Sequence, residues 1–240
     1  MLFFGSMVME LVLEGLQKQF DKKTVLNQID FSFSQGKIYS ILGRNGAGKT
    51  TLFRCISEDL TFEKGAVFLN ENGEMRKLSF ADVGMVSASP VLPEFLTGYE
   101  FVNFFVKLNE EELNGKSIDD YFEMMRIEEA DRHKLIKHYS YGMKNKLQLL
   151  CCLIRRPKII LLDEPLSSFD IIVSHEIKET LLRMKDNHII IMATHIMQLA
   201  QDISDEIILL KQGKLLEMNT GEMDETRFEE YVIDALNEGE

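Results

Sequence analysis

The feature that most constrains this chain is a glycine-rich stretch, Gly43–Thr51, placed between two segments of different character. The residues before it, Lys37–Leu42, have the pattern of a buried strand, and Thr50–Ile56 have that of a helix. The stretch has the form G-x-x-x-x-G-K-[ST]. In a strand–loop–helix context it predicts a loop whose backbone N–H groups point at a polyphosphate, helped by the partial positive charge of the helix N-terminus. An α/β fold is therefore expected.

Side chains of this loop have separate predicted tasks. Lys49 can reach the β- and γ-phosphates, the Thr50 hydroxyl can ligate Mg²⁺, and Thr51 adds a further phosphate contact. The other loop residues predicted to bind the ligand are Gly43, Asn45, Gly46, Ala47 and Gly48.

Composition limits the classes of partner. The chain of 240 residues has a net charge of −12, which argues against nucleic acid because Lys and Arg clusters drive that binding. Its three cysteines form no C-x-x-C pair, a pattern typical of a reduced, cytoplasmic protein. No apolar run approaches the ~18 residues needed to span a bilayer. Any membrane-embedded part is therefore expected in another chain.

Hydrophobic periodicity divides the sequence into three parts. Residues 8–87 and 156–220 are predicted to form an α/β core, and its N-terminal strands, Asp82–Val86 among them, are expected in a largely antiparallel β layer. Residues 88–155 are predicted to form an inserted α-helical subdomain, and residues 221–240 a short C-terminal extension.

Several element boundaries are marked by particular residues. Thr97 and Glu100 have the spacing of a capping box at a helix start, and Ser117 is expected to begin a second helix. Beyond the insertion, Ile159–Leu162 is apolar on both faces, as is typical of a central parallel strand, and Glu206–Met218 predicts a closing hairpin.

Two carboxylates follow the central strand. Asp163 stands at its carboxyl end, where it can hold Mg²⁺ directly or through water. Glu164 is placed to polarise a water that attacks the γ-phosphate. The pair also fits an ordinary acidic helix start, since Pro165 follows, but Lys49 upstream favours the catalytic interpretation.

Just before that strand lies the hexapeptide Tyr139–Lys144, with the sequence Y-S-Y-G-M-K. It resembles the signature motif of ATP-binding cassette (ABC) ATPases, usually L-S-G-G-Q, and is closer to the Y-S-x-G-M-K variant of many bacterial export-type cassettes. Ser140 and Gly142 match the family pattern, whereas Tyr141 replaces its first glycine. Ser140 also fits an ordinary helix N-cap, and the same geometry serves both purposes.

Other segments resemble the family in the same order. Ser167–Asp170 is similar to the D-loop, normally S-x-L-D, and His195, after Thr194, resembles the switch histidine that senses the γ-phosphate. Phe20 occupies the place of the aromatic residue that stacks on adenine, although an isolated Phe is also a common core residue. The resemblance covers about residues 8–220.

The resemblance implies a P-loop ATPase that uses ATP and Mg²⁺. Two cassettes, identical or different, would sandwich two ATP molecules so that Lys49 of one faces Ser140 and Gly142 of the other. Glu164 would act on water, and His195 would sense the γ-phosphate. Hydrolysis would drive a separately encoded transmembrane permease, with the cassette cytoplasmic and peripheral on the inner face of the cell membrane. The signature variant leans toward export.

One family element is missing. Family members carry a Gln shortly after the strand that corresponds to Asp82–Val86, but here the sequence is Ser87-Ala88-Ser89-Pro90, and no Gln occurs between Gln35 and Gln148. Because this Gln is missing, one alternative to a transport ATPase is a regulatory module that binds ATP with low turnover. A soluble ABC-type ATPase acting on DNA or ribosomes is the other alternative; such machines usually carry long coiled coils or two cassettes in one chain, and neither is seen.

Overall fold

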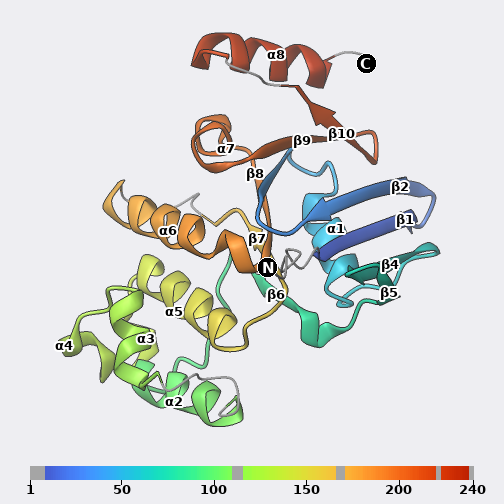
Figure 1. The fold of residues 1–240 in the computed structure, drawn as a ribbon. Helices are drawn as coiled ribbons and strands as arrows, with labels where there is room; N and C mark the ends of the chain where they lie inside the picture. Colours follow the sequence, from blue (N-terminus) through green and yellow to red (C-terminus); the bar gives the residue numbers. More distant parts are fainter. Residues whose placement is uncertain (1–8, 110–115, 166–170, 220–222, 238–240) are drawn as a thin grey trace, which may run out of the picture.

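The computed structural model describes residues 9–109, 116–165, 171–219 and 223–237, which form two β-sheets, a group of helices beside them and a C-terminal helix (Figure 1). The first sheet has the order β2-β1-β4-β5, and every neighbouring pair is antiparallel. Its strands are β1 (Met9–Phe20), β2 (Lys23–Ser34), β4 (Lys64–Glu71) and β5 (Glu74–Lys77). The predicted antiparallel layer is therefore present.

A bulge keeps one face of β1 apolar. Leu11 and Leu13 point into the core by simple alternation, but Leu16 is buried too, which alternation alone would not allow. The pairing with β2 shifts register between Leu13 and Leu16, where Gly15 has a φ of 57°. This extra residue in β1 turns Leu16 back toward the core and lets the strand continue to Phe20.

The second sheet carries the parallel core. Its order is β10-β9-β3-β8-β7-β6, parallel throughout except for the antiparallel pair of β9 and β10. The strands are β3 (Ile38–Leu42), β6 (Val83–Val86), β7 (Ile159–Asp163), β8 (Ile189–Thr194), β9 (Glu206–Lys211) and β10 (Lys214–Met218). The predicted central strand and closing hairpin are confirmed.

The prediction that the strand at Asp82–Val86 belongs to the antiparallel layer is wrong. β6 pairs in parallel with β7, with Gly84 opposite Ile160, so it forms an edge of the core sheet rather than part of the antiparallel layer. Asp82 instead ends a short 3-10 helix, η1 (Phe80–Asp82). A four-residue apolar run has too little alternation to indicate its partner, and that partner lies far away in the sequence.

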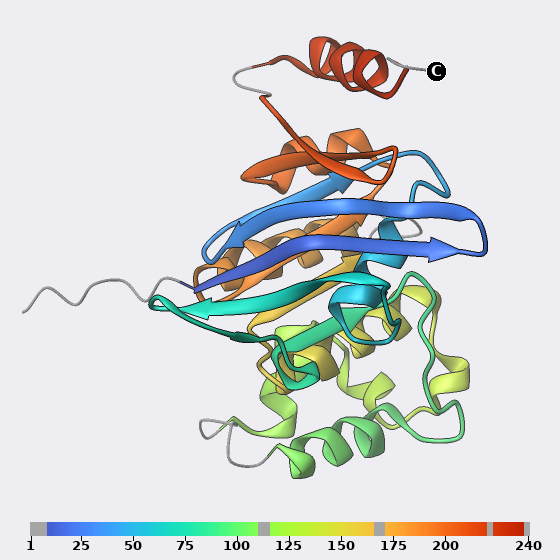
Figure 2. The ribbon, with the colours of Figure 1, turned by 90° about the vertical axis from the view of Figure 1, so that its right-hand side faces the viewer.

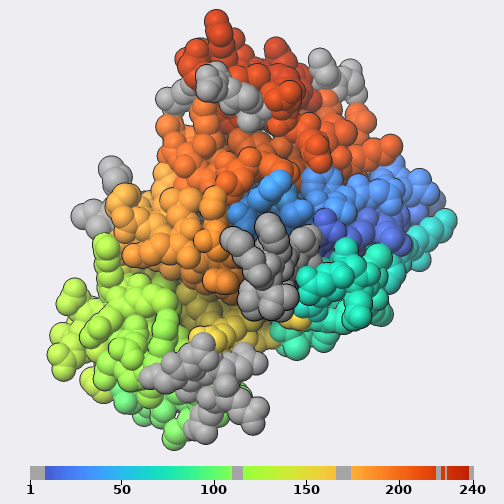
Figure 3. Space-filling model, viewed as in Figure 1, coloured from blue at the N-terminus to red at the C-terminus, as the bar shows by residue number. Residues whose placement is uncertain are grey.

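Helices cover both faces of the core sheet. α1 (Lys49–Ile56) packs between the two sheets, where Leu52 and Phe53 are fully buried. The opposite face meets α6 (Ile171–Met184), α7 (Met197–Ile203) and the helices of the insertion (Figure 2). The insertion contains α2 (Gly98–Leu108), α3 (Ile118–Met124), α4 (Glu129–Arg132), η3 (Ile136–His138) and α5 (Tyr141–Ile154), which form a lobe at one end of the molecule (Figure 3). The short η4 (Lys185–Asn187) follows α6.

Side-chain caps fix the starts of two insertion helices as predicted. The Glu100 N–H donates to Thr97 Oγ1 at 3.1 Å, and the Thr97 N–H donates to Glu100 Oε2 at 2.8 Å. Ser117 and Asp120 make the same reciprocal pair at the start of α3. Each box satisfies two backbone donors that a helix end otherwise leaves unpaired.

The last helix, α8 (Glu225–Asn237), lies at the opposite end from the lobe, beyond β9 and β10 (Figure 1). Phe228 and Val232 of this helix are buried in a small apolar cluster with Leu42 at the end of β3 and with Leu209. The C-terminal segment therefore packs next to the loop that follows β3. Among the described residues no helix is long and apolar enough to cross a membrane.

Gly84 marks a tight contact between β6 and the insertion. A Cβ added there would lie 2.3 Å from Cys152 Sγ and 2.7 Å from Pro157 Cγ. We expect Gly84→Ala to lower the free energy of unfolding by about 1–3 kcal/mol, because overpacking a buried contact forces its neighbours to shift. Urea unfolding measures this free energy. The loss caused by Gly84→Ala should be smaller in a Cys152→Ala background than in the wild type, because the clashing sulfur is then absent. An unchanged midpoint for Gly84→Ala would contradict this packing.

Candidate nucleotide-binding site

A cavity of about 380 Å³ opens where the carboxyl ends of the core strands meet the antiparallel sheet. β3 and β7 both pair with β8, so the loop after β3 and the carboxylates that end β7 lie at the same edge of the sheet. The lining residues are Phe20, Val25, Asn45, Gly46, Gly48, Lys49, Thr50, Thr51, Asp163 and Glu164. Most of the predicted binding residues are therefore brought together.

The glycine-rich loop has the backbone that its sequence predicts. Gly46 and Gly48 have φ values of 79° and 109°, a region that favours glycine. A Cβ on Gly48 would also lie 2.8 Å from Val25 Cγ1, so a side chain there would meet the cavity wall. Gly43 and Ala47 do not line the cavity: the Gly43 carbonyl accepts from Lys49, and the Ala47 N–H donates to the Arg44 carbonyl at 3.0 Å.

Lys49 is a buried ammonium held by oxygen atoms. The residue is 7% exposed, and its Nζ donates to the Gly43 carbonyl at 2.7 Å and lies 4.0 Å from Glu164 Oε1. Burial lowers the pKa of Lys49, while the Glu164 and Asp163 carboxylates oppose this effect. A cation with so little solvent around it would interact strongly with a phosphate that enters the cavity.

Thr50 and Asp163 form a pair suited to Mg²⁺. The Thr50 hydroxyl donates to Asp163 Oδ2 at 2.7 Å. Burial raises the pKa of Asp163, opposed by the hydrogen bond from Thr50. A hydroxyl and a carboxylate are oxygen ligands of the kind that Mg²⁺ prefers, with waters and substrate phosphates in its other positions. The described residues contain no cluster of three or more His, Cys, Asp or Glu side chains for an all-protein metal centre.

Glu164 has an unusual backbone and a defined side-chain partner. Its φ is 50°, which is rare for a residue with a side chain, and its N–H donates to the Ala193 carbonyl at 2.8 Å. Its Oε2 accepts a hydrogen bond from His195 Nδ1 at 2.8 Å. The turn after β7 therefore aims this carboxylate between Lys49 and His195. The sequence predicted Glu164 and His195 as site residues but not the hydrogen bond between them.

Comparison with known proteins identifies the family. A family model described as "ABC transporter" matches residues 26–167, more than half of the chain. The chain belongs to the ABC transporter family. It is similar to a bacitracin transport ATP-binding protein of Enterococcus faecalis, with 31% identity over 218 residues that cover 88% of this chain and 70% of that protein. It is also similar to a lantibiotic transport ATP-binding protein of Streptococcus pyogenes, 27% identical, with 86% and 89% covered.

Solved structures agree on the fold. An ATP-binding cassette captured as a dimer in a post-hydrolysis state with ADP and phosphate superimposes with a TM-score of 0.74 at 21% identity, over 89% of this chain and 100% of the other. Together with the family match, this makes the chain an ABC-type ATPase, the ATP-binding subunit of its system.

The signature residues of this ABC cassette stand apart from its own cavity. Ser140 and Gly142 are at the start of α5 and are not among the residues that line the cavity. Ser140 Oγ accepts from the Met143 N–H at 3.2 Å, so the predicted N-cap is confirmed. A role toward a second cassette stays a prediction, and the D-loop-like Ser167–Asp170 lies outside the described residues.

Three features of the cassette were not predicted from the sequence. Val25 forms part of the cavity wall, and the Arg44 guanidinium donates to Asn237 Oδ1 of α8 at 2.8 Å. The Tyr141 hydroxyl donates to the carbonyl of Ala88. The sequence reveals that Tyr141 and Ala88 both depart from the family pattern. Only the fold brings these two departures into contact.

Proposed function

We propose that this cassette binds Mg–ATP in the cavity, dimerises around it and hydrolyses it to drive a separate transmembrane permease. Lys49 and the loop amides would hold the phosphates, and Phe20 would stack on adenine at the rim. Thr50 and Asp163 would hold Mg²⁺, which neutralises phosphate charge when bound. The cavity that joins these residues is the observation that carries the proposal.

Glu164 and His195 would act at the γ-phosphate. The carboxylate of Glu164 would orient the attacking water and accept its proton, and the contact with His195 would keep that carboxylate in place. In a head-to-tail dimer, Ser140 and Gly142 of the second cassette, identical or different, would contact the same phosphate. The helix N-terminus behind them would favour its negative charge.

An exposed apolar patch supports a membrane-embedded partner. It is formed by four residues of the loop before α2 and of α2 itself: Val91, Phe95, Phe104 and Leu108, with Val91 91% and Phe95 78% exposed. Several large apolar side chains exposed on one loop and the helix that follows it are a feature of interaction sites. We propose that this patch, which we call the α2 patch, and the adjacent Pro90 and Pro93 dock on the permease at the inner face of the membrane. The signature variant favours export as the direction.

Co-expression with a candidate permease, a separately encoded membrane protein, tests the docking. Phe95→Asp should reduce recovery of the complex at least tenfold, because a carboxylate would be buried against an apolar partner. Ile233→Asp on α8, an exposed apolar position at the opposite end of the molecule, is the matched control and should leave recovery unchanged. Purification with ribosomes or DNA instead of a membrane protein would overturn the transporter proposal.

The missing Gln supports a second candidate, a cassette with slow turnover that acts mainly by binding ATP. Ala88→Gln should then raise kcat roughly ten- to hundredfold with little change in ATP affinity, since a water-positioning contact is worth about 1–3 kcal/mol in the transition state. The hydrogen bond from Tyr141 uses the backbone carbonyl of Ala88 and should survive the substitution.

Ser89→Gln, one residue on, is the control for Ala88→Gln and should leave kcat unchanged. Steady-state phosphate release measured at a series of ATP concentrations separates an effect on kcat from an effect on KM for ATP. An unchanged or lower kcat in Ala88→Gln would mean that another group positions the water.

A further inference from the structure

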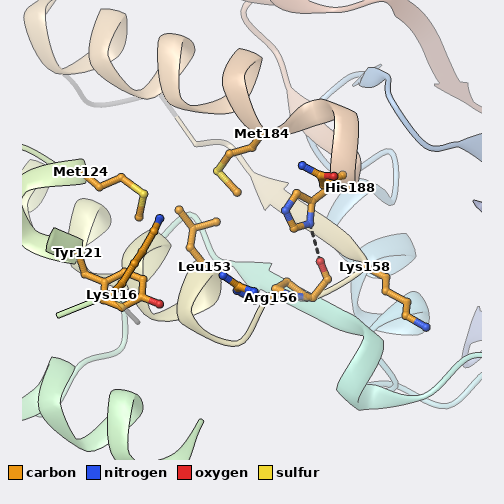
Figure 4. Close-up of a pocket in the computed structure, with 10 residues that line it drawn as sticks. Lys116, Tyr121, Met124, Leu153, Arg156, Lys158, Met184 and His188 are labelled. Carbon is orange, nitrogen blue, oxygen red and sulfur yellow. Dashed lines mark hydrogen bonds between the residues drawn. The ribbon is translucent and has the colours of Figure 1, made fainter. Parts of the chain in front are cut away.

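A second cavity, of about 530 Å³, lies at the other end of the core sheet from the nucleotide cavity (Figure 4). It is bounded by residues that precede β7 and β8, whereas Asp163 and Glu164 follow β7. Helix α3 and the ends of α5 and α6 form the remaining wall. Nothing in the proposed ATPase cycle uses this space, and its volume is within the range of small-molecule sites.

One side of this cavity is apolar and adaptable. Met124, Leu153 and Met184 contribute side chains from α3, α5 and α6 (Figure 4). The Tyr121 ring, which is almost fully buried, adds an aromatic surface. Methionine side chains repack easily around ligands of different shape. This side therefore suits an apolar chain.

The polar side is cationic in a chain whose net charge is −12. Lys116 and Arg156 line the cavity, and no carboxylate is among the described residues that line it. The Lys116 ammonium lies 5.7 Å from the centre of the Tyr121 ring. Lys158 also lines the cavity but is held by two 2.7 Å contacts to Glu71, and it points away from the other side chains in Figure 4. The charged side chains among the described lining residues are therefore all cationic.

His188 lies against the same cationic side. Its Nδ1–H donates to the Pro157 carbonyl at 2.7 Å, which fixes the ring in place. Burial lowers the pKa of His188, and the Arg156 charge adds to this effect. An anion beside the ring would oppose this lowering of the pKa and favour the protonated form.

We propose that this cavity is a binding site for a small amphipathic anion, with a carboxylate or phosphate at Arg156 and Lys116 and an apolar chain against Met124, Leu153 and Met184. A guanidinium pairs with either headgroup through two parallel hydrogen bonds. The ligand would contact α3 of the insertion and α6 of the core at once. This inference does not depend on the ATPase proposal, since the two cavities share no lining residue.

Methyl NMR of methionine-labelled protein tests the site with octanoate as the probe. Octanoate should shift the Met124 and Met184 signals saturably and leave Met75, an exposed residue of β5, unchanged. Affinity should rise roughly fourfold per added methylene from hexanoate to octanoate as each CH₂ is buried. Octylamine should cause no shift, because its charge has the wrong sign.

Two neighbouring arginines supply a matched pair of variants. Arg156→Gln should weaken octanoate binding at least tenfold. Arg155→Gln should not, because Arg155 faces Phe80, to whose carbonyl it donates at 3.3 Å. Equal shifts with octylamine, or unchanged binding in Arg156→Gln, would overturn the anion site. Vesicles of phosphatidic acid should cause no shift, and a shift with vesicles but none with octanoate would overturn the assignment to a free anion.

Discussion

Replacing Glu164 with Gln is expected to lower the rate of ATP hydrolysis about a thousandfold, within the range typical of losing a general base. The amide keeps the size of the side chain but cannot accept the proton of the attacking water. Lys49 and the loop amides are untouched, so ATP affinity should change only a few-fold. An ATP-bound dimer should then accumulate, visible by size-exclusion chromatography in the presence of ATP.

The control for this substitution is another Glu→Gln change outside the cavity. Glu179 on α6 forms an exposed ion pair with Arg126 and lies 3.5 Å from His175 Nε2, so Glu179→Gln should hydrolyse ATP at the wild-type rate. Phosphate release under saturating ATP measures both variants. Wild-type turnover in Glu164→Gln would remove this carboxylate from the mechanism.

Lys49→Met is expected to weaken Mg–ATP binding about ten- to hundredfold and to lower kcat/KM by about a thousandfold. A charge-assisted hydrogen bond contributes about 1.5–3 kcal/mol to binding, and a buried cation gains further importance as charge develops in the transition state. Methionine fills nearly the same space in the buried position without the charge. Calorimetric titration with ATP separates the binding loss from the catalytic loss.

Lys178→Met is the matched control, because Lys178 pairs with Asp202 on the surface between α6 and α7. It should bind ATP like the wild type. Should Lys49→Met also retain wild-type affinity, the loop amides alone would account for phosphate binding. Lys49→Met also removes the hydrogen bond to the Gly43 carbonyl, which could lower stability. A thermal melt of both variants therefore shows whether weaker ATP binding reflects a loss of folding.

The sequence was most informative where function is encoded locally. The loop at Gly43–Thr51 predicted its strand, its helix and most of the residues that line the cavity, because these roles depend on neighbouring residues. The caps at Thr97 and Ser140 were predictable for the same reason. Each is a contact between residues three apart, which spacing alone determines.

Contacts between distant segments could not be derived in this way. The sheet that β6 joins, the hydrogen bond between Glu164 and His195, and that between Tyr141 and Ala88 depend on how elements pack. Nothing in a four-residue strand or a lone tyrosine specifies a partner fifty or more positions away. The cavity proposed to bind an anion was likewise invisible in the sequence, because its residues come from three separate stretches of the chain.

The left-handed backbone at Glu164 has an evolutionary consequence. A non-glycine residue held there costs on the order of 1–3 kcal/mol, and surrounding contacts such as the hydrogen bond to Ala193 must offset it. Selection for folding alone would therefore favour Gly or Asn at this position, whereas the role proposed for Glu164 in hydrolysis would give selection a reason to retain Glu. A lineage that stopped hydrolysing ATP would be expected to lose this carboxylate early, by drift toward a more stable fold, while its phosphate-binding loop stayed intact.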